Sequence, residues 1–344
     1  MIQSQQTLVQ SVRDLGLQFL DNDVNITGHD CVSSVVLPDG STFWIFGDTL
    51  EGPFETVRYH PLVDVLSNTG CIVPMQNLSD GVRGFSYLKA PDGRRPRQLV
   101  QFLPHESRAE HRLWAVHGVC VGRYLYLYYH KITMDPVLDV FEAFEINGMG
   151  IARADLADMQ FERLRAPDGK YEFWKGDQPG LGVFIQEIED YVYLWGSLDK
   201  AMYLARVRPE QIEDLAAYEY LVQAPTFRRP DLAPRWSSTF ELSAPLFGNV
   251  PNEMSASFNH HLGAFISLTT FEREDKLVIR SAPRITGPWC EPEVFYRPLK
   301  TKPDSLFNAG KEHPEFARQD GKIIYMTFID SSVYVPHLLE ITLH

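Results

Sequence analysis

The chain has 344 residues, with 32 Lys and Arg against 45 Asp and Glu and a formal charge of −13. Its composition, 44% hydrophobic and 12% aromatic, is that of one or two globular domains whose core needs no metal or disulfide. The acidic balance excludes nucleic acid and anionic membranes as main partners, because both require clustered Lys and Arg. No basic and then apolar segment opens the chain, so we expect a cytoplasmic protein unless a secretory signal has been trimmed.

Pairs of short apolar and aromatic runs, each pair joined by a polar turn, predict a series of β-hairpins. The five pairs are Cys31–Leu37 with Thr42–Phe46, Trp114–Val119 with Tyr124–Tyr129, Leu181–Ile188 with Tyr191–Trp195, Met254–Asn259 with Ala264–Leu268, and Glu312–Phe316 with Ile323–Phe328. Third strands are expected at Gly150–Ala154, Ala201–Val207 and Leu277–Ala282. At Gln5–Phe19 and Gln211–Leu215 the spacing of apolar residues fits a helix as well as a strand. Neither segment lies between parallel strands, as a fold of alternating strands and helices would require.

Five hairpins at regular spacing predict an all-β fold, a single five-bladed β-propeller in which each hairpin belongs to one blade. The propeller would span residues 1–344, with residues 1–24 as an N-terminal extension packed on it. Two packed β-sandwiches are the alternative, but no linker is visible at mid-chain.

A set of phrases in a fixed order resembles the domain of unknown function family 4185, part of which is classed as glycoside hydrolase family 183. The phrases run from Gly28-His29-Asp30 and Phe46-Gly47-Asp48-Thr49 through Tyr191–Ser197, Tyr203–Val207, Glu253-Met254-Ser255, Phe258-Asn259 and Thr286–Trp289 to His313-Pro314-Glu315. The resemblance covers most of the chain from about residue 25 onward and implies a five-bladed propeller with endo-D-arabinanase activity. Members that cleave cell-wall arabinan look secreted, whereas no export signal is visible in this chain.

The first strand of each propeller blade begins near the central axis, so residues at these positions converge in one funnel. Those positions carry Asp30, His117, Gln178, Glu253 and the cluster Glu312-His313-Pro314-Glu315. Glycoside cleavage uses two carboxyl groups, one protonated and one ionised. The sequence therefore predicts a glycoside hydrolase acting on an oligosaccharide or polysaccharide, and the resemblance adds arabinofuranose as a candidate sugar.

Asp30 and Asp48 are predicted to lie opposite each other in the first hairpin. The turn Leu37–Ser41 has Pro38 and Gly40 where a three-residue loop needs them, and it pairs Leu37 with Ser41. Counting seven residues outward from both sides brings Asp30 opposite Asp48, with β-carbons about 5 Å apart. When two carboxylates lie close together, their repulsion raises the pKa of one of them. One carboxyl group can then act as the acid and the other as the base. The resemblance also implicates the acidic residues of this hairpin in catalysis; alternatively, Asp48 caps a turn and Asp30 binds backbone amides.

Glu253 is the third catalytic candidate. His117, Trp174, Gln178, Glu312, His313 and Glu315 are candidates for substrate binding, and further aromatic platforms are Trp114, Trp195, Trp236, Phe54 and Tyr59. A solvated acid or a structurally satisfied imidazole is the alternative for the Glu and His residues.

Cofactors are not expected, because the four cysteines follow no metal-binding spacing and no nucleotide motif is present. The central channel leaves room for a structural cation. Two other functions remain open: a carbohydrate-binding propeller without catalysis, and a cytoplasmic glycoside phosphorylase, which would need Arg58, Arg112 and Lys311 to form a phosphate pocket.

Overall fold

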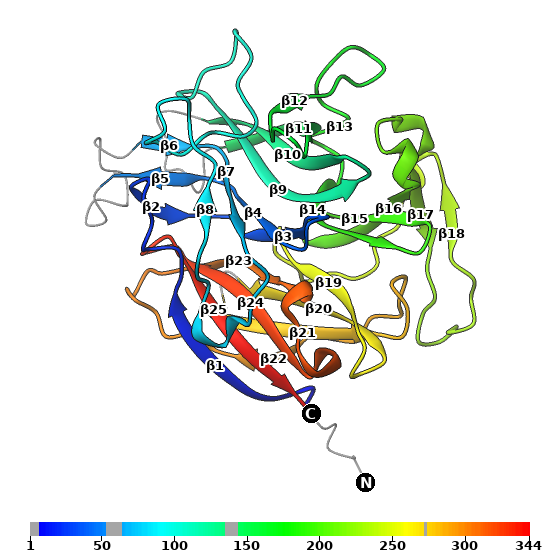
Figure 1. Ribbon diagram of the computed structural model, residues 1–344. Coiled ribbons are helices and arrows are strands. Elements are labelled where there is room, and N and C mark those ends of the chain that lie inside the picture. Colours follow the sequence, from blue (N-terminus) through cyan, green and yellow to red (C-terminus); the bar gives the residue numbers. More distant parts are fainter. Residues whose placement is uncertain (1–6, 53–63, 135–143, 272–273) are drawn as a thin grey trace.

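The computed structural model describes residues 7–52, 64–134, 144–271 and 274–344, and this part of the chain is built from antiparallel β-sheets (Figure 1). Helical structure within it is limited to 3-10 turns, among them η2 (Leu78–Asp80), η3 (Pro209–Gln211), η4 (Leu215–Ala217), η5 (Phe240–Leu242), η6 (Pro314–Phe316) and η7 (Gln319–Gly321). The all-β prediction is confirmed. No helix of the described residues is long and apolar enough to cross a membrane.

Five sheets of four or five strands follow one another along the chain, accompanied by one small sheet. The first contains β3 (Ser33–Val36), β4 (Thr42–Phe46), β7 (Thr69–Val73) and β8 (Ser86–Tyr87); the second β9 (His111–Val121), β10 (Tyr124–Met134), β11 (Phe144–Asp155), β12 (Phe161–Arg163) and β13 (Trp174–Lys175); the third β14 (Gly180–Ile188), β15 (Tyr191–Leu198), β16 (Ala201–Val207), β17 (Glu219–Gln223) and β18 (Arg235–Ser237). The fourth contains β19 (Ser255–Asn259), β20 (Ala264–Phe271), β21 (Lys276–Ala282) and β22 (Glu293–Tyr296); the fifth β23 (Phe307–Glu312), β24 (Ile323–Asp330), β25 (Val335–Leu343) and β1 (Val9–Leu17); the small sheet β2 (Ile26–His29), β5 (Thr49–Glu51) and β6 (Asp64–Leu66).

The predicted hairpins begin four of the five large sheets as expected, namely β3–β4, β9–β10, β14–β15 and β19–β20. In the first hairpin Leu37 N–H donates to Ser41 O at 2.8 Å, and Gly40 has a φ of +84°, as the predicted three-residue loop requires. The first strand of the fifth hairpin differs from the prediction. It runs from Phe307 to Glu312, and the chain then bends into η6.

The N-terminal segment whose apolar spacing also fitted a helix contains strand β1, which pairs with β25 at the opposite end of the chain. Residues 9–17 thus contribute a strand to the fifth sheet. Around residues 211–215 only the short turns η3 and η4 form. Neither of the two stretches with competing helical periodicity forms an α-helix within the described residues.

Successive sheets share hydrophobic clusters, and these clusters bring the first strands together. Phe43 of the first sheet packs with Leu127 of the second, while Trp44 of the first packs with Tyr325 of the fifth. The other three clusters join the second sheet to the third, the third to the fourth and the fourth to the fifth. Lys311 of β23 also hydrogen-bonds Ser33 of β3, so side chains from the two ends of the chain meet.

Candidate active site

A cavity of about 440 Å³ lies where the first strands meet, and it contains the carboxylates predicted to be catalytic. Its lining residues are Asp30, Cys31, Gly47, Asp48, Trp114, Val116, His130, Phe144, Ile146, Gly176, Gln178, Gly180, Val183, Ser197, Leu198, Asp199, Asn252, Glu253, Leu306, Asn308, Ser331 and Tyr334. A wider surface depression of about 760 Å³ beside Tyr124 and Glu213 contains none of the predicted site residues.

The predicted pairing of Asp30 with Asp48 is present. Asp30 N–H donates to Asp48 O at 2.9 Å, and Gly47 N–H donates to Asp30 O at 2.8 Å. Cys31 has a φ of +52°, which bends the strand at this point. A β-carbon on Gly47 would lie 2.9 Å from that of Cys31, so only glycine fits there. This local geometry brings both carboxyl groups to one cavity.

Asp30 is held by three hydrogen-bond donors. Its Oδ1 accepts from Cys31 N–H at 2.7 Å and from Asn308 Nδ2 at 2.9 Å, and its Oδ2 accepts from the Tyr334 hydroxyl at 3.0 Å. Burial, followed by the negative charges of Glu253 and Asp48, raises the pKa of Asp30 to about 7 against the lowering effect of the Cys31 and Tyr334 hydrogen bonds. At neutral pH this carboxyl group can therefore carry a proton.

Asp48 is also buried but lies beside a cation. The Nε atom of Arg112 lies 3.6 Å from Asp48 Oδ1. Burial raises the pKa of Asp48 to about 6, while Arg112 and the nearby Trp114 indole oppose the rise. The indole lacks hydrogen-bonding geometry toward this carboxylate. Asp48 is therefore the more acidic member of the pair and is mainly ionised at neutral pH.

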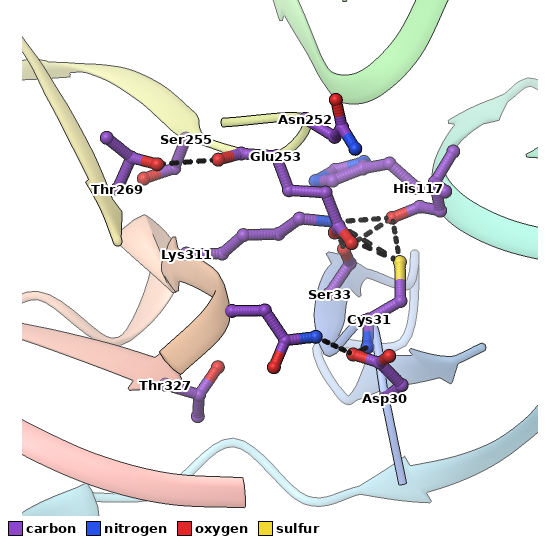
Figure 2. Close-up of polar contacts among 12 residues, drawn as sticks. Asp30, Cys31, Ser33, His117, Asn252, Glu253, Ser255, Thr269, Lys311 and Thr327 are labelled. Atoms are coloured by element: carbon purple, nitrogen blue, oxygen red, sulfur yellow. Dashed lines mark hydrogen bonds and ion pairs between the residues drawn. The ribbon is translucent and has the colours of Figure 1, made fainter. Parts of the chain in front are cut away.

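Glu253 reaches the cavity from the loop before β19 and is paired with a buried lysine (Figure 2). Lys311 Nζ lies 2.6 Å from Glu253 Oε2 and also donates to Ser33 Oγ and Val116 O, both at 2.9 Å. The Cys31 thiol donates to Glu253 Oε2 at 3.1 Å. A third carboxylate, with its own counterion, thus lies near Asp30.

Trp114, one of the aromatic platforms predicted from the sequence, lines the cavity, and Phe144 and Asn308, which were not predicted, complete its wall. Trp114 and Phe144 form an edge-to-face pair with ring centroids 5.0 Å apart. Among the described residues, Trp114 Nε1 and Asn308 Oδ1 are buried without a hydrogen-bond partner. Unpaired polar atoms beside an aromatic surface suit a ligand with hydroxyl groups and apolar ring faces.

Of the predicted substrate-binding residues, Gln178 lines the cavity and the others do not. The Oε1 of Gln178 accepts from Lys175 N–H at 2.9 Å, which fixes its side chain. His117 is buried with its Nδ1 2.9 Å from the Gly118 N–H, and burial together with Lys311 lowers its pKa to about 3. Trp174 is 2% exposed and donates its indole N–H to Tyr220, so its prediction as a stacking platform was wrong.

The cluster in the fifth sheet is likewise interior rather than cavity-lining, contrary to the prediction. His313 is fully buried, lies between Ser34 Oγ at 2.5 Å and Thr327 Oγ1 at 2.8 Å, and stacks on Trp44. These contacts join the first sheet to the fifth and give His313 a structural position.

The two glutamates beside His313 also face the interior. Glu312 accepts from Ser257 Oγ at 2.6 Å, and burial raises its pKa to about 7. Burial raises the pKa of Glu315 as well, although a hydrogen bond from Ser34 opposes the rise. Neither side chain reaches the cavity.

No group of three or more His, Cys, Asp or Glu side chains in the described ranges could hold a metal ion. Two protein cations lie near the first strands, the ammonium of Lys311 beside Glu253 and the guanidinium of Arg112 beside Asp48. Of the other candidates, Trp195 is buried in the core, Trp236 packs at the edge of the same cluster, and Phe54, Arg58 and Tyr59 lie outside the described residues.

Comparison with solved structures places the chain among known folds. A candidate hydrolase from Bacteroides ovatus is similar with a TM-score of 0.67 and 14% identity over 93% of this chain and 87% of that protein. A family 43 (GH43_1) glycoside hydrolase from Xanthomonas citri is similar with a TM-score of 0.54 and 12% identity, over 97% of this chain and 90% of that protein. A family 117 glycoside hydrolase from Zobellia galactanivorans is similar with a TM-score of 0.51 and 9% identity, over 97% of this chain and 91% of that protein. At these identities the likeness concerns the fold.

No curated protein matches the sequence. A family model, however, matches residues 18–337, which is most of the chain and includes all three cavity carboxylates. The chain therefore belongs to the family described as domain of unknown function (DUF4185).

Proposed function

We propose that the chain is a glycoside hydrolase built on a five-bladed β-propeller, with Asp30 and Asp48 as its catalytic carboxyl groups. Five hydrophobic clusters, each joining two neighbouring sheets and one joining the fifth to the first, support the five-blade arrangement. Fold similarity to glycoside hydrolases of families 43 and 117 supports the activity. An experimental structure with a different number of blades would contradict the first part of the proposal.

The observation that carries the proposal is the pair of opposed carboxyl groups in one cavity, with pKa values of about 7 for Asp30 and about 6 for Asp48. Asp30 would act as the general acid that protonates the leaving oxygen. Asp48, whose charge Arg112 stabilises, would act as the base that activates water or as the nucleophile. Glu253, which is paired with Lys311, lies near Asp30, and its negative charge helps to raise the pKa of Asp30.

The proposed substrate is an oligosaccharide or polysaccharide, with arabinofuranose-containing glycans first to be tested because of the family resemblance. The aromatic surface of Trp114 and Phe144 suits the apolar face of a sugar ring. The unpaired Trp114 Nε1 and Asn308 Oδ1 can bind sugar hydroxyls, and the side chain of Gln178 borders the same space. We propose carbohydrate as the ligand class on these grounds.

Phosphorolysis is the less favoured alternative, because the cations that it requires are engaged with protein groups. Lys311 is paired with Glu253 and Arg112 with Asp48. A phosphate pocket would require these ion pairs to break. Binding without catalysis is the other alternative and is decided by experiment.

The test is a panel of arabinofuranose-, galactose- and xylose-containing oligosaccharides incubated with the wild-type protein, Asp30→Asn, Asp48→Asn and, as a control, the exposed Asp231→Asn. We expect release of reducing ends by the wild type and by the control, and a loss of about 10²- to 10⁴-fold or more in the two cavity variants. The rate should not depend on inorganic phosphate. Binding of a glycan without turnover, at equal affinity in all four proteins, would favour a carbohydrate-binding module.

A further inference from the structure

Tyr334 lies at a strained point of the backbone beside the cavity. It is the last residue of the turn between β24 and β25, lines the cavity and has a φ of +57°. A bulky residue rarely adopts this left-handed conformation, which costs free energy unless the surrounding structure holds it. The contacts that hold Tyr334 therefore indicate what its position serves.

Hydrogen bonds on both sides of Tyr334 fix its backbone. Its N–H donates to Asp330 O at 2.8 Å, and its carbonyl oxygen accepts from His29 N–H at 2.7 Å. A β-carbon on Gly28 would lie 2.6 Å from the same carbonyl oxygen, so only glycine fits there. The segment that leads into Asp30 thus also holds the backbone of Tyr334.

Asp330 secures the turn from its other end. It is 1% exposed, and its carboxylate accepts from Ser332 N–H at 2.8 Å, Ser332 Oγ at 2.7 Å and Thr301 N–H at 3.1 Å. Burial acts to raise the pKa of Asp330, but these hydrogen bonds outweigh it and lower the value. A turn fixed in this way presents the Tyr334 side chain in one position.

The Tyr334 hydroxyl reaches one particular oxygen of Asp30. It lies 3.0 Å from Asp30 Oδ2, whereas Oδ1 accepts from Cys31 N–H at 2.7 Å and from Asn308 Nδ2 at 2.9 Å. An oxygen whose two lone pairs already accept N–H donors leaves no place for a proton, so the acid form of Asp30 carries its proton on Oδ2. A hydroxyl group can donate or accept, and Tyr334 therefore fits both forms of Asp30.

We propose that Tyr334 is a further catalytic residue, whose hydroxyl stabilises the carboxylate that Asp30 becomes when Oδ2 gives its proton to the leaving glycosidic oxygen. The Oδ2–H bond breaks, an O–H bond to the leaving oxygen forms, and the bond between sugar carbon and leaving oxygen breaks with its electron pair on that oxygen. The Tyr334 hydroxyl donates to Oδ2 and keeps its own proton. The catalytic role rests on the proposed function, whereas the hydrogen bond does not.

Removal of this hydroxyl should make Asp30 a weaker acid. Burial, Glu253 and Asp48 raise the pKa of Asp30, whereas the hydrogen bonds from Cys31 and Tyr334 lower it. The other charged and titratable groups around Asp30 are Glu253 with its partner Lys311, Asp48 with its partner Arg112, and the Cys31 thiol. Tyr334→Phe removes none of them and keeps the aromatic ring, so the pKa of Asp30 should rise.

The first test follows the titration of Asp30 by ¹³C NMR, with its carboxyl resonance identified by its absence in Asp30→Asn. Tyr334→Phe should raise the midpoint by about one pH unit, because the carboxylate loses a hydrogen-bond donor. The matched control is Tyr325→Phe, which should leave the midpoint unchanged, since Tyr325 donates to Glu340 Oε2 at 2.8 Å away from the cavity. An unchanged or lower midpoint in Tyr334→Phe would overturn the inference.

The second test compares two substrates of the same sugar, one with a nitrophenol leaving group that needs no proton and one with a sugar leaving group that does. In Tyr334→Phe, kcat should fall about tenfold for the second substrate and change little for the first. The alkaline limb of the kcat profile should move to higher pH by the same amount as the NMR midpoint.

Two negative results separate this inference from the proposed function. Equal losses on both substrates would assign Tyr334 a purely structural role and overturn the inference, while the hydrolysis by the wild type would stand. Absence of turnover by the wild type on every glycan would refute the proposed function and, with it, the catalytic role of Tyr334.

Discussion

Replacing the proposed general acid should stabilise the folded protein at neutral and alkaline pH. The pKa of Asp30 is raised by burial and by neighbouring negative charges from 3.8 to about 7. Between these two values the unfolded chain releases the Asp30 proton while the folded chain keeps it, so the free energy of unfolding falls as pH rises. This destabilising contribution of Asp30 to the free energy of unfolding is absent below about pH 3.8 and complete above about pH 7.

The size of the effect follows from the same two values. A difference of about three pKa units corresponds to at most roughly 4 kcal/mol, and Asp30→Asn removes this cost because an amide does not ionise. The variant keeps an oxygen for Cys31 and Asn308, and the Tyr334 hydroxyl can turn to accept from the new amide. We expect the net gain relative to the wild type to be close to zero at pH 4 and to reach about 1 to 3 kcal/mol at pH 7 to 8.

The assay is urea unfolding of the wild type and Asp30→Asn at pH 4, 5, 6, 7 and 8, followed by circular dichroism. The difference in the free energy of unfolding should increase with pH and level off above about pH 7. The exposed Asp231→Asn should give no such trend. A difference that is independent of pH, or that falls as pH rises, would refute the description of Asp30 as a carboxyl group kept protonated by the fold.

Three further changes test the site and its support. Asp48→Asn should lower turnover by about 10²- to 10⁴-fold without lowering the thermal midpoint; comparable activity, or a large loss of stability, would contradict this. Gly310→Ala should cost about 1 to 3 kcal/mol in urea unfolding, because its β-carbon would lie 2.7 Å from the Thr270 backbone nitrogen, whereas the control Gly248→Ala meets no atom within 3.8 Å. His313→Ala should lower stability by about 3 kcal/mol with turnover nearly unchanged, since it removes two buried hydrogen bonds and no cavity wall; the opposite pattern would return His313 to the active site.

The parts of the fold that were predictable from sequence are those determined locally. The turn Leu37–Ser41 specifies its own loop geometry, and the register continues outward until Asp30 meets Asp48. Strand β1 was misread because register shifts after Val9 and Asp14 interrupt the alternation of its side chains. Its partner, β25, lies at the far end of the chain, which no local pattern indicates.

The site residues that were missed or wrongly assigned depend on long-range geometry. Asn308 and Lys311 face inward because of an irregular strand, and the Ala309-Gly310 pair was its only local sign. Trp174 lies in a polar stretch but is buried because β13 pairs with β11. His313 was predicted at a strand mouth in the funnel, but strand β23 ends at Glu312, before it.

The pH dependence of kcat/KM on a cleaved glycan tests the assignment of acid and base most directly. With Asp48 ionised above about pH 6 and Asp30 protonated below about pH 7, the wild type should show a narrow bell with its optimum between these values. In Asp30→Asn, a substrate with a leaving group that needs no proton should be cleaved with the alkaline limb absent. A wild-type profile without these limbs, or an alkaline limb that persists unchanged in Asp30→Asn, would contradict the roles given to the two carboxyl groups.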